Sequence, residues 1–231
     1  MSKLQKPTRR TDGLNTLNLI LDTAERLFAV DGYAAVSLRK ITGQANVDLA
    51  LVNYYFGSKE GLFKQVLARR VDKMSAERLA YLEHAQLVPR SEQSVIDLLE
   101  GFTRPIIGHT PEEVAELRNY RLLIALVANS KEWQDFIFRE RYDPVAIQFI
   151  DAFARVIPDA DRNELCWAFS FFLGSMVNTL AETGRIDRLS YGACRSDDLE
   201  TAMRQLINYT AAGFLSCSRP KPASEGAQQC A

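Results

Sequence analysis

Apolar and polar residues follow a helical spacing between residues 37 and 56, SLRKITGQANVDLALVNYYF. Leu38, Ile41 and Ala45 recur at intervals of three and four, which places them on one face of a helix. Ser37 precedes this stripe, and a serine hydroxyl is a preferred cap for the first turn of a helix. The pattern therefore predicts a short helix that begins after Ser37.

A second short helix is predicted directly after a sharp turn. Asn46 lies where the chain must turn, and Asn tolerates a left-handed backbone better than most non-glycine residues. Asp48 is the next candidate N-cap, and Val52 and Phe56 return to the core four residues apart. The face turned away from the core then holds Leu49, Ala50 and Asn53.

Helical spacing continues through the rest of the chain. A helix is expected from about Leu17 to Phe28, ended by Asp31 and Gly32, and a long helix from Lys59 to about His84. No segment has a strand pattern, so the predicted fold class is all-α. Further helices are expected over residues 93–108, 110–129, 131–157 with an irregularity at Asp143-Pro144, 161–182 and 197–216.

Charge is unevenly distributed in a chain of otherwise ordinary composition. The 231 residues are 47% hydrophobic and 25% charged, as expected of a globular protein. Residues 1–90 hold 14 Lys and Arg against 9 Asp and Glu, whereas residues 91–231 hold 14 against 20. A basic half favours nucleic-acid binding, although modest imbalances also arise by chance. No apolar run reaches the roughly 18 residues of a membrane span and no signal peptide is recognised, so a cytoplasmic location is expected.

Residues that carry catalytic or metal chemistry form no motif. The chain has no Gly-rich phosphate loop, no HExxH and no GxSxG, so no catalytic residue, cofactor or metal is expected. His84 and His109 are isolated near predicted helix ends. Free thiols are favoured over a zinc site or a disulfide framework because CxxC spacing is absent from the four cysteines, Cys166, Cys194, Cys217 and Cys230.

The helix, turn and helix of residues 37–56, followed by YYFGSKEGLF, resemble the N-terminal domain of the TetR/AcrR family of bacterial transcriptional regulators. The resemblance runs from about Leu17 to Val71 and is most specific in LFAVDGYAAVSLRKI and in Ser58-Lys59-Glu60. Family members often carry Tyr at the position of Asn53, a difference that bears on DNA sequence preference.

The resemblance also implies a division of the chain. A helix-turn-helix DNA-binding domain is expected at residues 15–60 and a helical regulatory and dimerisation domain at 61–217, with 59–84 as the connecting helix. A basic arm at residues 1–14 and a tail at 218–231 are expected to be disordered because both are polar.

The exposed face of the second short helix is expected to enter the DNA major groove, which is wide enough for one helix. Leu49 and Ala50 suit thymine methyl groups, and Asn53 suits adenine or a phosphate. Tyr55 and Leu49 could instead belong to the core, and Lys59 could be merely solvated. The resemblance adds Arg39 as a guanine contact and four phosphate contacts, Ser37, Tyr54, Tyr55 and Lys59.

A homodimer on double-stranded DNA with a palindromic operator is implied, because one such unit makes few contacts. The last two helices are the family's usual dimer surface, although the same stripe would serve an internal core equally well. The candidate interface residues are Phe169, Phe172, Met176, Leu199, Met203, Leu206 and Phe214.

The C-terminal half is rich in aromatic residues, which suit a pocket for a small hydrophobic effector of the kind that family members bind. Arg121 precedes the apolar run LLIALV and is expected to reach either an acidic partner helix or the carboxylate or phosphate of an acyl-type ligand. The segment ELCWAFSFFLGSM resembles regulators that sense fatty acids or their thioesters. Candidate pocket residues are Phe102, Tyr120, Arg121, Phe149, Phe153, Trp167, Phe171, Ser175 and Asn178.

The expected function is a repressor that a small effector releases from its operator. Two other interpretations remain: an interaction module whose DNA-binding head has degenerated, suggested by the apolar reading face, and an all-helical enzyme. Loss of operator binding on removal of Arg39 and Lys59 separates the first from the module, and turnover by the purified protein would support the enzyme.

Overall fold

The computed structural model describes residues 9–217, and within that range the chain is all-α, as predicted. None of these helices is long and apolar enough to span a bilayer. The described residues form twelve α-helices and one π-helix: α1 (Arg9–Ala35), α2 (Leu38–Ala45), α3 (Leu49–Phe56), α4 (Lys59–His84), α5 (Glu92–Ile107), α6 (Pro111–Glu116), α7 (Arg118–Val127), α8 (Lys131–Trp133), η1 (Gln134–Tyr142), α9 (Asp143–Val156), α10 (Arg162–Leu180), α11 (Arg185–Leu189) and α12 (Leu199–Ser216).

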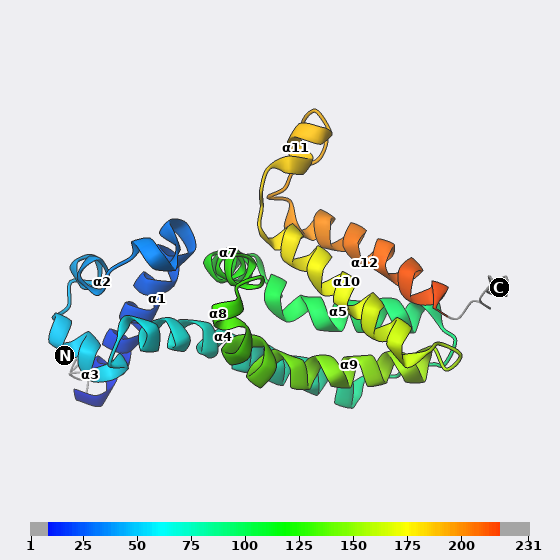
Figure 1. Ribbon diagram of the computed structural model, residues 1–231, viewed down its shortest axis with the longest axis horizontal. Coiled ribbons are helices and arrows are strands. Elements are labelled where there is room, and N and C mark those ends of the chain that lie inside the picture. Colours follow the sequence, from blue (N-terminus) through cyan, green and yellow to red (C-terminus); the bar gives the residue numbers. More distant parts are fainter. Residues whose placement is uncertain (1–8, 218–231) are drawn as a thin grey trace, which may run out of the picture.

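Helices α1, α2 and α3 form a compact head at one end of the molecule (Figure 1). Helix α1 begins at Arg9, so residues 9–14, expected to belong to a disordered arm, are helical instead. The backbone leaves helical geometry at Gly32, with φ 77° and ψ 159°, where the sequence predicts an end. Residues 1–8 and 218–231, the remaining parts of the two ends expected to be disordered, lie outside the described range.

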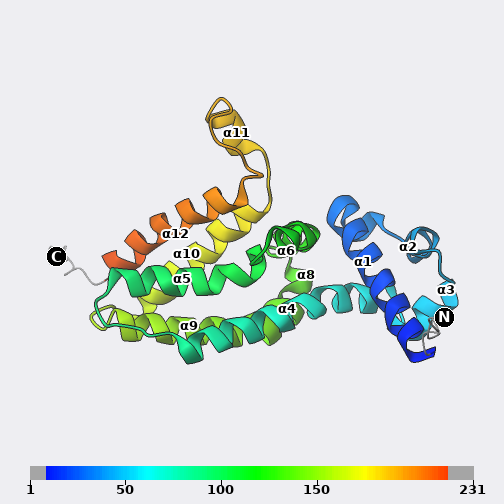
Figure 2. The ribbon, with the colours of Figure 1, turned by 180° about the vertical axis from the view of Figure 1, so that it is seen from behind.

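Helix α4 leaves the head and runs into a larger helical body. It lies beside α9, and α10 and α12 lie side by side over α5, an arrangement that the front and back views share (Figures 1 and 2). The short helix α11 sits on an arm that projects away from this body (Figure 2). The connecting helix was predicted with the bounds that the structure gives, Lys59–His84.

One hydrophobic core continues from the head into the body. It extends from Ile20 in α1 to Phe214 in α12 without a break between the two parts. Trp133 joins them, since its ring lies 5.0 Å from the Tyr33 ring and 4.5 Å from the Phe63 ring. Because aromatic side chains bury large apolar areas, this contact fixes the head against the body.

Three local features differ from the predicted helices. The segment after Thr110 forms two helices, α6 and α7, separated at Leu117. The segment after Ser130 forms a short α-helix and then the π-helix η1 before α9 begins at Asp143, so the irregularity expected at that residue lies just before it. Helix α11 was not predicted.

Candidate nucleic-acid interface

Capping side chains fix both ends of the turn between α2 and α3. The Ser37 hydroxyl accepts a hydrogen bond from the Lys40 amide at 3.2 Å, which starts α2. Asn46 ends α2 in the left-handed conformation, with φ 52° and ψ 48°. The Asp48 carboxylate then accepts from the Ala50 amide at 2.7 Å and starts α3. These contacts orient α3 relative to α2.

Helix α3 buries one face and exposes another. Val52 is fully buried in the core, whereas Ala50 and Asn53 are exposed and Leu49 is half-buried. Within the described part of the chain, the side-chain amide of Asn53 makes no hydrogen bond. The helix lies at the end of the molecule opposite α9 to α12 (Figure 1), so the body does not cover its outer face. The predicted reading residues therefore share one accessible surface.

Two tyrosines near the carboxyl end of α3 enlarge this exposed surface. Tyr54 is 81% exposed and Tyr55 is 38% exposed, and their ring centroids lie 5.3 Å apart in an edge-on arrangement. An exposed phenol hydroxyl at the rim of such a surface can donate to a phosphate. Neither ring is part of the buried core, the alternative that the sequence left open for Tyr55.

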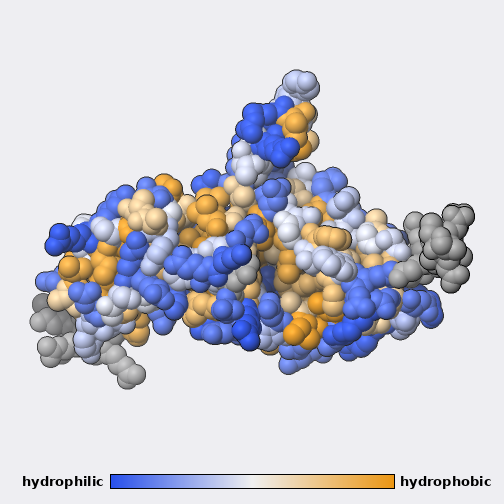
Figure 3. All heavy atoms as spheres, viewed as in Figure 1, coloured by the Kyte–Doolittle hydropathy of each residue, from blue (hydrophilic) through white to orange (hydrophobic). Residues whose placement is uncertain are grey.

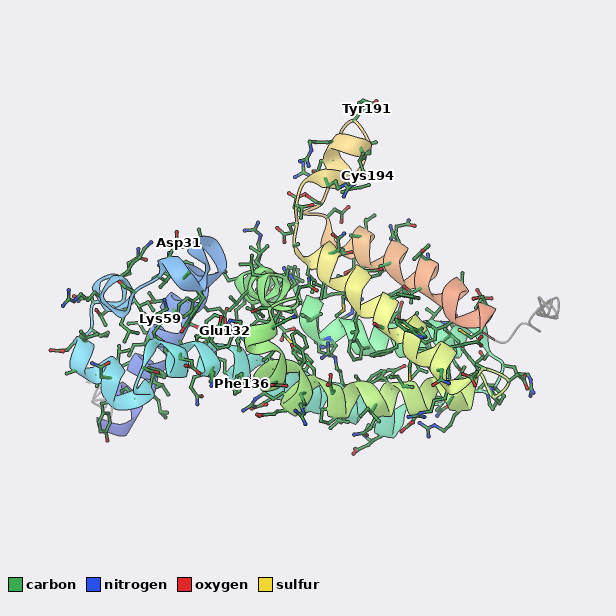
Figure 4. The ribbon with its side chains drawn as sticks, viewed as in Figure 1. Asp31, Lys59, Glu132, Phe136, Tyr191 and Cys194 are labelled. Atoms are coloured by element: carbon green, nitrogen blue, oxygen red, sulfur yellow. The ribbon has the colours of Figure 1, made fainter. Side chains whose placement is uncertain are left out.

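Lys59 is held inside the head instead of being merely solvated. Its ammonium lies 4.3 Å above the Tyr33 ring centroid and 3.5 Å from the Ala34 carbonyl oxygen. Figure 4 shows it within the head, at the start of α4. Lysine has three N–H donors, so the contact with Ala34 leaves others available.

Arg39 is the exposed cation of α2 whose charge is not paired. Its neighbour Lys40 is paired with Asp31 at 3.0 Å, and Arg26 donates to the Gln44 amide oxygen at 2.5 Å. Among the side chains that the structure describes, no carboxylate lies within 4.0 Å of the Arg39 guanidinium. A guanidinium in this state matches the two acceptors of a guanine edge.

A charged network joins the head to the body and was not predicted. Glu25 of α1 is 3% exposed, and its carboxylate lies 2.8 Å from the Arg69 guanidinium and 3.4 Å from that of Arg70. Arg70 also reaches Glu116 of α6 at 2.7 Å. The position of Glu25 beside the apolar residues of α1 was a signal that sequence reasoning could have used, because buried carboxylates need partners.

Two protein-family models match the chain. The model for bacterial regulatory proteins of the tetR family matches residues 20–66, and the tetracyclin repressor-like C-terminal domain model matches residues 100–213. The chain belongs to the TetR family. It is accordingly a TetR-family transcriptional regulator whose head is a helix-turn-helix DNA-binding domain.

Solved TetR-family structures share the fold. A regulator from Rhodococcus sp. aligns with a TM-score of 0.59 at 16% identity, covering 85% of this chain and 99% of its own. PfmR from Thermus thermophilus aligns with a TM-score of 0.58 at 20% identity, covering 84% and 97%. A regulator from Saccharomonospora viridis, solved in complex with choline, aligns with 0.57 at 19% identity, covering 85% and 97%. No curated protein sequence matches the chain significantly.

The candidate pocket residues of this TetR-family regulator do not lie together. Phe102, Phe149 and Phe153 are buried in the core, with the Phe102 and Phe149 rings 5.1 Å apart. The Tyr120 hydroxyl is also buried and contacts the Leu67 carbonyl at 3.4 Å. Four other candidates are separate from these buried residues, because they lie on the surface of α10 and are partly or fully exposed. They are Trp167, Phe171, Ser175 and Asn178.

Arg121 has neither of the partners expected for it. Its guanidinium donates to the Ile107 carbonyl at 3.1 Å and to the Val114 carbonyl at 2.8 Å. These oxygens belong to the ends of α5 and α6, where carbonyl groups lack helical partners. The partners of the buried Arg121 guanidinium are therefore backbone carbonyl groups. No acidic helix or bound anion is needed to explain its burial.

The seven candidate dimer residues do not form a surface, because each is at most 8% exposed within a single chain. The prediction that they form the dimer interface is therefore wrong. Their stripe faces the internal core, the alternative that the periodicity left open. The exposed aromatic residues of the same helices lie on the other side and line a groove between α10 and α12: Trp167, Phe171 and Tyr209. Figure 3 shows pale and orange surface over these two helices, with blue surface around it.

Proposed function

We propose that this protein is a homodimeric repressor that binds a palindromic operator and that a small hydrophobic effector releases from DNA. The observation that carries the proposal is the exposed face of α3 on a rigidly capped helix-turn-helix unit. Repression, dimerisation and ligand response are typical of the TetR family. In this proposal the protein acts in the cytoplasm as a regulator and not as an enzyme.

The head makes two kinds of contact in this proposal. Arg39 binds guanine, while Leu49, Ala50 and Asn53 meet thymine methyl groups and adenine. Phosphate contacts fix the register without reading sequence, and they come from Ser37, Tyr54, Tyr55 and a free donor of Lys59. The unpaired charge of Arg39 supports its role, because a base contact then breaks no internal ion pair.

The dimer forms through the groove between α10 and α12. Trp167 and Phe171 are 64% and 66% exposed, and a surface with such aromatic side chains is typical of an interface core. Ala212 and Gly213 lie beside them and allow close approach of a second copy. A two-fold axis through this surface sets the two heads for half-sites about 34 to 36 Å apart.

The effector binds in the helical body. The Saccharomonospora viridis regulator, which shares the fold, was solved with choline, so a small-molecule site in this fold has precedent. In the present chain the charged contacts of Glu25 with Arg69 and Arg70 join α1 to α4, and they offer a physical route from the body to the head.

The proposal is tested by selecting binding sites for the full-length protein from a random duplex library, followed by fluorescence anisotropy. We expect a two-fold symmetric site to be enriched. Arg39→Ala should weaken binding to that site by about 10- to 100-fold, the loss of one bidentate base contact. Arg139→Ala is the matched control, because Arg139 is also exposed but lies on η1.

Two outcomes would count against this function. Failure to enrich any symmetric site at low salt would favour an interaction module whose head no longer reads DNA. Equal losses for Arg39→Ala and Arg139→Ala would show that general charge, and not a base contact, accounts for the binding.

A further inference from the structure

The segment between α10 and α12, residues 183–198, projects from the body and is here called the α11 arm (Figures 1 and 2). Its three large apolar side chains, Ile186, Leu189 and Tyr191, are 45%, 66% and 99% exposed. None of the three is part of the hydrophobic core of the described residues. The arm therefore presents apolar surface that its own chain leaves open to solvent.

Hydrogen bonds within the α11 arm hold its shape. The Asp187 carboxylate accepts from the Ser196 amide at 3.0 Å, and the Ser190 hydroxyl accepts from the Cys194 amide at 2.8 Å. The Asp187 carbonyl also accepts from the Gly192 amide at 2.8 Å. These bonds join the two sides of the arm across its tip. The arm is thus ordered in advance, and a partner that binds it does not have to order it.

The base of the α11 arm is fixed to α7. The Glu182 carboxylate, whose side chain is 9% exposed, accepts from Arg118 Nε at 3.1 Å and from Arg118 Nη2 at 2.7 Å. Charge-assisted hydrogen bonds of this kind are strong and directional. The arm therefore leaves the body in a defined direction.

Tyr191 has an unusual backbone conformation at the tip of the α11 arm (Figure 4). Its φ is 53°, in the left-handed region, where a bulky side chain is an outlier. The next residue, Gly192, has φ 85°, which glycine adopts without such strain. Strained backbone of this kind is concentrated at functional sites. At this tip it accompanies an almost fully exposed aromatic ring.

Two arginines add unpaired positive charge to the arm. Among the side chains that the structure describes, no carboxylate lies within 4.0 Å of the Arg185 or Arg188 guanidinium. Arg195 differs, because it is paired with Asp197 at 2.6 Å. Tyrosine and arginine are enriched at protein interfaces. Since residues 91–231 hold 20 acidic against 14 basic side chains, the body of a second copy has charge of the opposite sign.

The α11 arm is continuous with the surface proposed for dimerisation. It connects the end of α10 to the start of α12, the two helices that expose Trp167, Phe171 and Tyr209. In Figure 3 the orange atoms of the arm lie on its side toward α12, and the blue atoms lie toward the head. A second copy bound over α10 and α12 would stand beside this apolar side. DNA suits the arm less well, because α3 lies at the far end of the head in both views (Figures 1 and 2).

We propose that the α11 arm reaches across the dimer and packs its apolar side, with Leu189 and the Tyr191 ring at the centre, against the body of a second copy of this chain. The inference rests on the proposed homodimer and adds an exchanged segment to it. A two-fold axis makes the contact reciprocal, so each copy provides one arm and receives one. The interface then extends beyond the groove between α10 and α12.

The first test compares the dimer dissociation constants of full-length variants by sedimentation equilibrium. Leu189→Ser combined with Tyr191→Asn removes both apolar groups, and asparagine accepts the left-handed backbone at the tip. We expect the dissociation constant to rise by about 10- to 100-fold, the loss of one or two interface anchors. Ile147→Ser is the matched control, because Ile147 is 51% exposed on α9, which lies at the opposite edge of the body from the arm (Figure 1). It should leave the constant unchanged.

A second test identifies what the tip of the arm touches. Tyr191→p-benzoylphenylalanine keeps an aromatic ring at the tip, and on irradiation this ring bonds covalently to a neighbouring molecule. We expect covalent dimers of the purified full-length protein from position 191 and none from the same replacement of Ile147. Circular dichroism checks that each variant keeps its helical fold, which we expect because all the replaced side chains are exposed.

Either of two results overturns the exchanged arm. One is a dissociation constant that the double replacement leaves unchanged. The other is irradiation at position 191 that yields no covalent dimer, whether the ring bonds to DNA, to a different protein or to nothing. Both results leave the proposed homodimer and operator binding intact, because the unaltered protein still dimerises. A protein that sediments as a monomer at every concentration would instead contradict the arm and the proposed homodimer together.

Discussion

At the scale of single residues, short polar side chains determine where the helices of the head begin. Ser37, Asp48 and Ser58 each accept a hydrogen bond from an amide in the first turn of the helix that follows. An eight-residue helix such as α3 has few internal hydrogen bonds, so its cap contributes a large share of its local stability.

The cap of α3 yields the first prediction at this scale. Asp48→Ala should lower the free energy of unfolding by about 1 kcal/mol, because the Ala50 amide loses its acceptor. Asp48→Asn should cost much less, because asparagine caps helices about as well as aspartate does. Urea unfolding followed by circular dichroism measures both. Equal losses for Asp48→Asn and Asp48→Ala would assign the effect to charge and not to the cap.

Caps and turns could be predicted from the sequence because their partners lie within four residues. Asn46 has the left-handed backbone expected of it, and the Thr110 hydroxyl accepts from the Glu113 amide at the start of α6, where a helix was expected to begin. The partners of Arg121 and Arg78 could not be predicted in this way. Arg121 bonds to residues 7 and 14 positions away, and Arg78 bonds to a residue 24 positions away. Such contacts depend on the packing of helices.

At the scale of elements, the crossing of α4 and α5 depends on one glycine. A Cβ added at Gly101 would lie 2.3 Å from Cε1 of Tyr81, well inside van der Waals contact. Tyr81 has little freedom to move, because its hydroxyl donates to the Asp97 carbonyl at 2.7 Å. Burial raises the pKa of Tyr81 to about 12, so this donor keeps its proton at neutral pH.

The glycine at this crossing gives the prediction at the scale of elements. Gly101→Ala should destabilise the protein by about 1 to 3 kcal/mol, because α4 and α5 must separate to admit the methyl group. Gly43→Ala is the matched control within a helix, since a Cβ there meets nothing within 4 Å, and it should stabilise the protein by about 0.5 to 1 kcal/mol. Thermal unfolding distinguishes the two. Equal effects would contradict the crowding.

The helices with strong periodicity could be predicted, whereas irregular elements could not. The bounds of α4 follow from Ser58 and from its apolar spacing. Nothing in the sequence of residues 134–142 distinguishes the π-helix from an α-helix, because the two differ in backbone pairing and not in the residues they require. Helix α11 has five residues, too few for a periodic signal, and its arm carries Tyr191 at the tip and Cys194 nearer the body (Figure 4).

At the scale of the whole molecule, α10 and α12 are apolar on two faces. One face fills the core through Phe172 and Phe214, and the other exposes Phe171 and Tyr209. A periodic stripe identifies an apolar face but not the partner that covers it, which is why the predicted interface residues proved to be internal. The surface available to a second copy could be identified only in the structure, from the exposure of Phe171 and Tyr209.

The exposed face gives the prediction for the assembly. Phe171→Glu should convert the proposed homodimer into a monomer, because two carboxylates would meet at the two-fold axis without partners. Val88→Glu alters a residue of similar exposure, 57%, in the connection between α4 and α5, and should leave the dimer intact. Sedimentation velocity measures the change, and circular dichroism checks the fold. A dimer that survives Phe171→Glu would place the interface elsewhere.

Arg78 divides helix α4 into a long segment toward Lys59 and a short segment toward His84. Lys59 and Arg78 are 19 positions apart, so the two lie about 28 Å apart along the axis at about 1.5 Å per residue. A tilt of about 10° around Arg78 would displace the amino end by about 5 Å, close to half the width of the major groove at about 12 Å. Such a tilt would also have to shift Phe63 and Tyr33 against Trp133, so the contact that joins the head to the body resists the loss of register.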